Sequence, residues 1–64
     1  MEEYLVQIIF DSNGEIKYVH KELNFINDDE SAGRFTEEYA NKVGDNIRAR
    51  RHDVIVEVIH ESEL

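Results

Sequence analysis

The chain has 64 residues, no cysteine and a net charge of -8, with fifteen Asp and Glu against seven Lys and Arg. A chain of this length forms one domain, residues 1–64, and buries only about 60% of the surface that its unfolded form would expose, so its core is small and a partner chain would help to stabilise it. The composition excludes disulfide bonds and thiolate zinc sites, and the negative charge opposes binding to nucleic acid or to an anionic membrane.

The first predicted element is a β-strand over residues 3–10, in which Tyr4 to Phe10 read YLVQIIF. Successive side chains on a strand point to opposite faces, so this nearly continuous apolar run predicts a strand that is covered on both faces. The sequence DSNG at 11–14 then predicts a hairpin, because Asn-Gly between two strands is the strongest short hairpin signal.

Residues 15–25, EIKYVHKELNF, alternate in polarity and predict a second strand at the sheet edge, where lysines discourage stray pairing. The loop length decides which side chains face the core. A two-residue Asn-Gly turn places Val19 and Leu23 on the face of the even-numbered residues of the first strand. A three-residue loop with Gly in a left-handed bulge places Ile16 and Tyr18 there instead, and we favour this second register.

A helix is predicted after the acidic segment INDDES at 26–31. Four apolar residues recur every four positions, which is typical of an amphipathic helix with one apolar stripe: Phe35, Tyr39, Val43 and Ile47. The first residue of the helix stays open by about one turn. Several side chains are able to cap it: Asn27, Asp28, Asp29, Ser31 and Thr36.

Residues 54–61, VIVEVIHE, predict the third strand. The order strand, strand, helix, strand favours a two-layer α+β domain (β-β-α-β) in which one helix covers one face of a three-stranded sheet. The spatial order 2-1-3 makes the first strand central and the sheet wholly antiparallel, and the order 1-2-3 is the alternative.

The sheet face away from the helix is expected to be apolar. It carries four large aliphatic residues: Leu5, Ile9, Ile55 and Ile59. One patch of this kind exceeds what a monomer normally exposes, so we expect a second surface, most simply another copy of the chain, to cover it. The alternative is that these side chains are scattered singly among polar neighbours.

No catalytic or cofactor-binding motif is found in the sequence. His20, His52 and His60 lie on separate elements without the short spacing of metal sites. The one basic cluster suits the negative end of the helix dipole better than a phosphate backbone: Arg48, Arg50 and Arg51. We therefore predict a protein that is not an enzyme, has no cofactor or metal, and does not bind nucleic acid directly.

Acidic residues are more extensive than basic ones. They line the loop before the helix and the outer helix face: Asp28, Asp29, Glu30, Glu37, Glu38 and Asp45. Carboxylates spaced along a rigid element can imitate the phosphates of a nucleic acid and occupy a basic protein groove. The alternative is a solvated helix face whose charges keep the protein soluble.

The pattern YLVQIIFDSNG, the following strand with His20 and the helix sequence EEYA together resemble small uncharacterised bacteriophage early proteins. The resemblance covers about the first forty residues. It implies a phage-encoded protein from a class in which acidic single-domain inhibitors of host enzymes or defence systems are frequent. It assigns no binding residues.

These expectations favour a small acidic module that inhibits a host nucleic-acid-handling or defence protein by nucleic-acid mimicry, binding its basic surface as a homodimer. The alternative is a non-enzymatic dimeric interaction or assembly subunit that uses its apolar sheet face. The N-terminus has no basic segment followed by an apolar run, and no segment approaches the ~20 apolar residues that span a membrane. We therefore expect a location in the cytoplasm, that of the host cell if the protein is phage-encoded.

Overall fold

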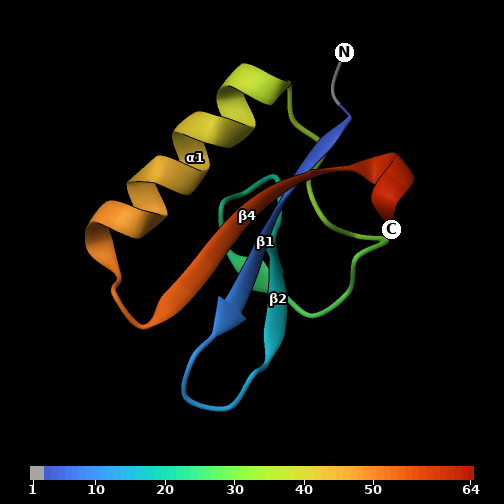
Figure 1. Ribbon diagram of the computed structural model, residues 1–64. Helices are drawn as coiled ribbons and strands as arrows, with labels where there is room; N and C mark the ends of the chain where they lie inside the picture. Colours follow the sequence, from blue (N-terminus) through green and yellow to red (C-terminus); the bar gives the residue numbers. More distant parts are fainter. Residues whose placement is uncertain (1–2) are drawn as a thin grey trace.

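The computed structural model describes residues 3–64, which form a four-stranded antiparallel sheet with one helix against one face (Figure 1). The elements are β1 (Tyr4–Phe10), β2 (Ile16–Val19), β3 (Phe25–Ile26), α1 (Glu37–Arg50), β4 (Val54–His60) and the 3-10 helix η1 (Glu61–Glu63). The spatial order of the strands is β3-β2-β1-β4. The α+β class and the antiparallel sheet are confirmed, whereas the prediction of three strands is wrong.

The first strand is central, and this explains its apolar run. β1 pairs with β4 along its whole length, from Tyr4 opposite His60 to Phe10 opposite Val54, and with β2 on its other edge. Leu5, Val6 and Ile8 are fully buried. A central strand is paired along both edges and lies inside the sheet, where a second layer of the protein can cover each of its faces.

The predicted second strand is in fact two short strands joined by a tight turn. The His20 N–H donates to the Asn24 carbonyl at 2.8 Å, and the Leu23 N–H donates to the His20 carbonyl at 2.7 Å. Leu23 adopts a left-handed conformation with φ of 67°. Three-residue hairpin loops often contain such a residue, and it is usually glycine. The sequence KEL has neither glycine nor proline, so alternation alone predicted an uninterrupted strand.

The register of the first hairpin places Val19, and not Ile16 or Tyr18, on the helix side of the sheet. The Phe10 N–H donates to the Glu15 carbonyl at 2.9 Å, so four residues, 11–14, connect β1 to β2. Ile16 lies opposite Ile9, on the face away from α1. The favoured three-residue loop is therefore wrong. A four-residue loop places the same β2 side chains on the helix side of the sheet as a two-residue turn would. The two loops differ by two residues, and side chains on a strand alternate between faces with a period of two.

Helix α1 begins after Thr36, the last of the candidate caps. The Thr36 Oγ1 accepts the Tyr39 N–H at 3.2 Å, which satisfies one of the unpaired donors of the first turn. Gly44 faces the sheet, where an added Cβ would lie 3.3 Å from Val56 Cγ1. The glycine therefore allows a close approach of α1 to β4.

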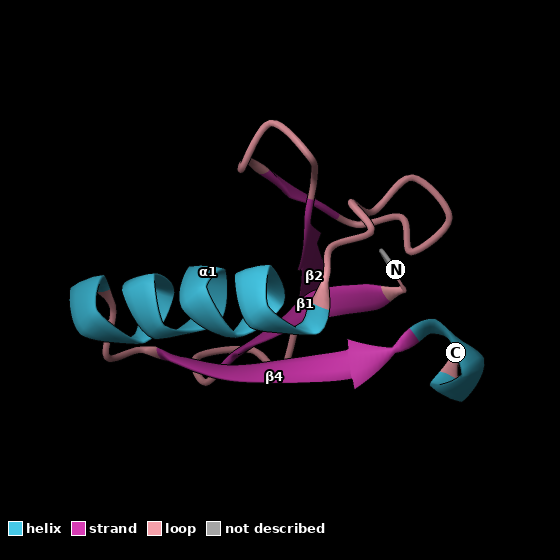
Figure 2. Cartoon of the chain, turned by 90° about the horizontal axis from the view of Figure 1, so that it is seen from above, coloured by secondary structure: helices cyan, strands magenta, loops and turns pink. Residues whose placement is uncertain are grey.

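The core lies between α1 and the sheet. It contains Val6, Ile8, Val19, Phe35, Ala40, Val43 and Val56. The helix packs over β4 and β1, and Figure 2 shows it lying along β4. Because α1 is displaced toward that edge, it covers the helix-side face of β2 and β3 only in part.

Candidate functional site

The acidic residues predicted on the outer surface do not form one continuous row. Asp28 is used locally, since its Oδ1 accepts the Glu30 N–H at 2.9 Å and its Oδ2 accepts the Ser31 hydroxyl at 3.0 Å. Asp45 forms an ion pair with Arg48 at 3.1 Å. Within α1, three acidic residues are balanced by three basic ones, so the helix has no net charge. The helical part of the predicted surface is thus an acidic first turn, Glu37 and Glu38, followed by mixed charges.

Carboxylates from separate segments meet where β1 begins and β4 ends. We call Glu3, Glu37, Glu61 and Glu63 the acidic end. The charge of Glu37, followed by partial burial and by the charges of Glu3 and Glu63, raises the pKa of Tyr4 above its ordinary value. Sequence analysis included only Glu37 of this group, because strand pairing brings the others to it.

His60 contacts both Glu3 and Ser62 at the acidic end. Its Nδ1 accepts the Ser62 N–H at 3.1 Å, so the proton lies on Nε2, which contacts Glu3 Oε2 at 2.9 Å. The Ser62 hydroxyl lies 2.8 Å from the same Nδ1. This connectivity resembles a Ser-His-acid relay, but the backbone N–H of Ser62 already occupies the nitrogen that would take the hydroxyl proton. The contacts cap η1 and hold the chain ends together.

The sheet face away from α1 carries a row of three isoleucines. Ile16, Ile9 and Ile55 lie side by side on β2, β1 and β4. Ile16 is 45% exposed and Ile55 is 50% exposed. We call these three residues the isoleucine row. Only two of its members belong to the predicted patch, because the predicted hairpin register had placed Ile16 on the helix side.

Leu5 does not lie in an uncovered patch. It is fully buried by its own chain, and its neighbour Ile59 is half-buried. Leu5 and Ala32 are both buried, yet neither belongs to the helix-side core. Ala32 lies in the loop 27–35, whose Arg34 pairs with Glu61 at 3.2 Å. Sequence analysis treated this loop as the connection to the helix and as part of the acidic surface, and did not expect a buried residue in it.

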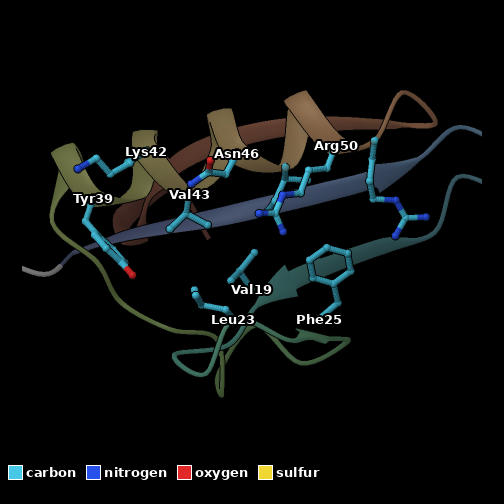
Figure 3. A pocket seen from close by; sticks show the side chains of 10 residues that line it. Val19, Leu23, Phe25, Tyr39, Lys42, Val43, Asn46 and Arg50 are labelled. Atoms are coloured by element: carbon cyan, nitrogen blue, oxygen red, sulfur yellow. The ribbon is translucent and has the colours of Figure 1, made fainter.

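A groove of about 460 Å³ lies between α1 and the strands β2 and β3. Figure 3 shows Val19, Leu23 and Phe25 on one side of it and Tyr39, Val43 and Arg50 of α1 on the other. Val19 and Val43 are buried, so the floor of the groove is apolar. No Asp or Glu is among its lining residues, although the chain has fifteen of them.

Arg51 closes the groove at the end of α1. Its guanidinium lies 5.2 Å from the Phe10 ring centre and 6.0 Å from the Phe25 ring centre, a favourable cation–π geometry. Two hydrogen bonds at 3.1 and 3.0 Å join it to Asp53. These bonds lower the pKa of Asp53 below its ordinary value.

Two other basic residues of the groove, Lys42 and Arg50, are unpaired. Within residues 3–64, neither side chain forms a hydrogen bond or an ion pair. By contrast, the side chains of Lys17, Arg34, Arg48 and Arg51 each pair with a carboxylate. Sequence analysis missed this site. The sequence nevertheless contains a pattern that indicates the groove. Lys42, Asn46 and Arg50 recur every four residues, so they lie on one face of the helix. This face adjoins the apolar stripe of Tyr39, Val43 and Ile47.

Leu23 lines the groove from a strained backbone. A left-handed conformation costs a non-glycine residue roughly 1–2 kcal/mol. Leu23 is 53% exposed, so the burial of its side chain offsets only part of that cost. A half-exposed leucine where glycine would be easier to accommodate contributes little to the stability of the fold.

Two further features bear on function. Residues 3–64 contain no group of three or more His, Cys, Asp or Glu side chains placed to hold a metal ion. Over the same residues, α1 is too short and too polar to cross a membrane, and so is η1.

Comparison with protein-family models, with curated proteins and with solved structures gave no match. The functional argument therefore depends on the surfaces described above.

Proposed function

We propose that this chain is a non-enzymatic protein-binding module whose acidic end docks onto the basic surface of a partner. The observation that carries the proposal is the convergence of Glu3, Glu37 and Glu63 around Tyr4, whose pKa is raised chiefly by the charge of Glu37. Carboxylates held on paired strands and a capped helix offer ordered anionic oxygens, which Lys and Arg bind with charge-assisted hydrogen bonds. A net charge of -8 also accelerates encounter with a basic surface.

The partner class follows from charge and from the resemblance described above. Basic surfaces that bind ordered anions are typical of proteins that handle nucleic acids. The resemblance to small phage early proteins favours a host protein of this kind, or a defence protein, that is inhibited when carboxylates occupy its phosphate sites. The contact surface proposed here is centred on Glu37, Glu3 and Glu63, with the loop acids Asp28 to Glu30 as a second acidic segment, whereas Asp45 is neutralised by Arg48.

A pull-down from bacterial lysate tests this proposal. We expect the immobilised protein to retain a nucleic-acid-binding protein whose retention falls as NaCl rises, because screening weakens exposed ion pairs. The double variant Glu37→Gln with Glu63→Gln should lose that protein. The matched variant Asp11→Asn with Glu15→Gln removes the same charge from the distant hairpin and should keep it. The proposal is contradicted if both variants lose the retained protein equally, or if the amount retained does not change with NaCl concentration.

A second candidate function is an assembly subunit that associates through the isoleucine row. The exposed Ile16 and Ile55 flank Ile9 on three adjacent strands, which gives a flat apolar strip of the kind found at interface cores. The double variant Glu37→Gln with Glu63→Gln separates the two candidates, because it should abolish binding through the acidic end and leave association through the sheet unchanged.

A further inference from the structure

We propose that the groove between α1 and the strands β2 and β3 binds an acidic peptide segment that carries large apolar side chains. This site is separate from the acidic end and has the opposite charge preference. The inference depends on three features of the groove: its unpaired basic residues, their spacing, and the strained leucine at its edge.

The charges of the groove are unusual for this chain. Acidic residues outnumber basic ones by about two to one, so a basic side chain easily finds a carboxylate. Lys42 and Arg50 nevertheless have none within the described residues, and both lie beside an apolar floor that contains Val19 and Val43. Basic residues at the rim of an apolar groove favour a ligand that is both anionic and apolar.

The spacing of these residues suits a ligand with two anionic groups, which a peptide can offer. Lys42 and Arg50 are eight positions apart on α1, which corresponds to about 12 Å at 1.5 Å per residue. Two carboxylates about that far apart can each pair with one of them. Carboxylates about four residues apart on an extended segment span that distance at about 3.3 Å per residue, and so do carboxylates two turns apart on a helix. Apolar side chains between them would contact Phe25 and Ile47.

Leu23 supplies an independent argument. Its φ of 67° is unfavourable for a leucine, and its half-exposed side chain lines the groove. Residues held in strained backbone conformations cluster at active sites and ligand-binding sites. Contact with the peptide would bury the side chain of Leu23.

The test uses two synthetic peptide sets labelled with fluorescein. The first set has Glu at every polar position and Leu or Phe at every apolar position, in both strand-like and helical patterns, and the second set replaces every Glu by Lys. We expect anisotropy titrations to detect binding of at least one acidic pattern that depends on Lys42 and Arg50, whereas a Lys peptide that binds the acidic end should not depend on them. If no acidic pattern binds, or if the Lys peptides show the same dependence on Lys42 and Arg50, the proposal is wrong.

Matched variants then locate the site. Replacing Lys42 and Arg50 by Ala should weaken the acidic peptide about tenfold, because two exposed ion pairs together contribute about that factor. The control variant Asn41→Asp with Ala49→Glu changes the net charge by the same amount on the same helix, outside the groove, and should bind as the wild type does. Equal binding by the two variants would overturn the assignment.

Leu23→Gly separates binding from folding. Glycine relieves the backbone strain and removes the side chain, so we expect unchanged or higher thermal stability together with weaker peptide binding. Binding that equals the wild type would show that Leu23 does not contact the peptide. NMR chemical shifts provide the final check: shifts at the isoleucine row instead of the groove would assign the peptide to the other face.

One arm of the experiment tests a different occupant. Dodecanoate offers a single carboxylate and an alkyl chain. If it binds and depends on Lys42 and Arg50 while every acidic peptide fails, the groove takes a lipid-like anion and the peptide proposal is wrong.

Discussion

Tyr4 and Phe35 exchange two backbone hydrogen bonds, at 2.9 and 2.8 Å, and so pair the first residue of β1 with the residue that precedes the cap of α1. This bridge fixes the point at which the chain leaves the sheet and enters the helix. Phe35 is buried in the core, and its ring lies 5.4 Å from that of Tyr39 in the first turn of α1. The start of the helix is therefore set from both sides, by the bridge and by the Thr36 cap.

The Thr36 cap gives the first prediction. Thr36→Ala should lower the free energy of unfolding by about 1 kcal/mol, because the Tyr39 N–H loses its acceptor. Urea denaturation measures the change. Ser31→Ala is the control, since Ser31 was also a candidate cap but its hydroxyl donates to Asp28 in the loop. If the Ser31 variant loses more stability than the Thr36 variant, the assigned helix start is incorrect.

The turn between β2 and β3 gives the second prediction. Leu23→Gly should raise the free energy of unfolding by about 1 kcal/mol through relief of the left-handed strain. Leu23→Ala also shortens the side chain but keeps the strain, so its stability should not rise. Thermal denaturation of the two variants measures the difference. Equal stability of both would place Leu23 outside the left-handed region.

The acidic end gives a prediction about pH. The pKa of Tyr4 is raised in the folded state above its value of 10.0, so the folded chain holds this proton more tightly than the unfolded chain does. The corresponding stability is complete below about pH 10 and is lost as the pH rises through the folded pKa. Tyr4→Phe should therefore remove part of the alkaline loss of stability.

The same feature can be measured directly by NMR titration of the tyrosine rings. Glu37→Gln should bring the pKa of Tyr4 closer to its ordinary value, because Glu37 makes the largest contribution to the shift. Glu57→Gln, in the middle of β4, is the control and should leave the Tyr4 titration unchanged. An unaltered Tyr4 pKa in the Glu37 variant would contradict the geometry of the acidic end.

The isoleucine row gives a prediction about association. We expect the mass from light scattering to rise above that of a monomer as protein concentration increases, and Ile55→Lys to suppress the rise by adding a charge to the apolar strip. Leu64→Lys is a matched control, because Leu64 is 52% exposed but lies outside the sheet. A wild-type protein that stays monomeric at every concentration would exclude this interface.

Local patterns in the sequence were sufficient for much of the fold. Alternation and apolar runs located β1 and β4, and a four-residue period located α1, because these periods reflect backbone geometry. They were insufficient where local signals were weak. The KEL turn lacks glycine and proline, and the hairpin register depends on a loop length that the residues DSNG leave open.

The sequence by itself determined the α+β class with one helix and an antiparallel sheet and favoured a central β1, because the periods of helix and strand and an apolar run needing cover on two sides leave few arrangements for a chain this short. Only the tertiary structure decided the surfaces. Strand pairing brings Glu3 and Glu63 to Glu37, the folded chain buries Leu5, and the displacement of α1 toward β4 opens the groove beside Lys42 and Arg50. Contacts between residues far apart in the chain depend on topology and register, which no local pattern records.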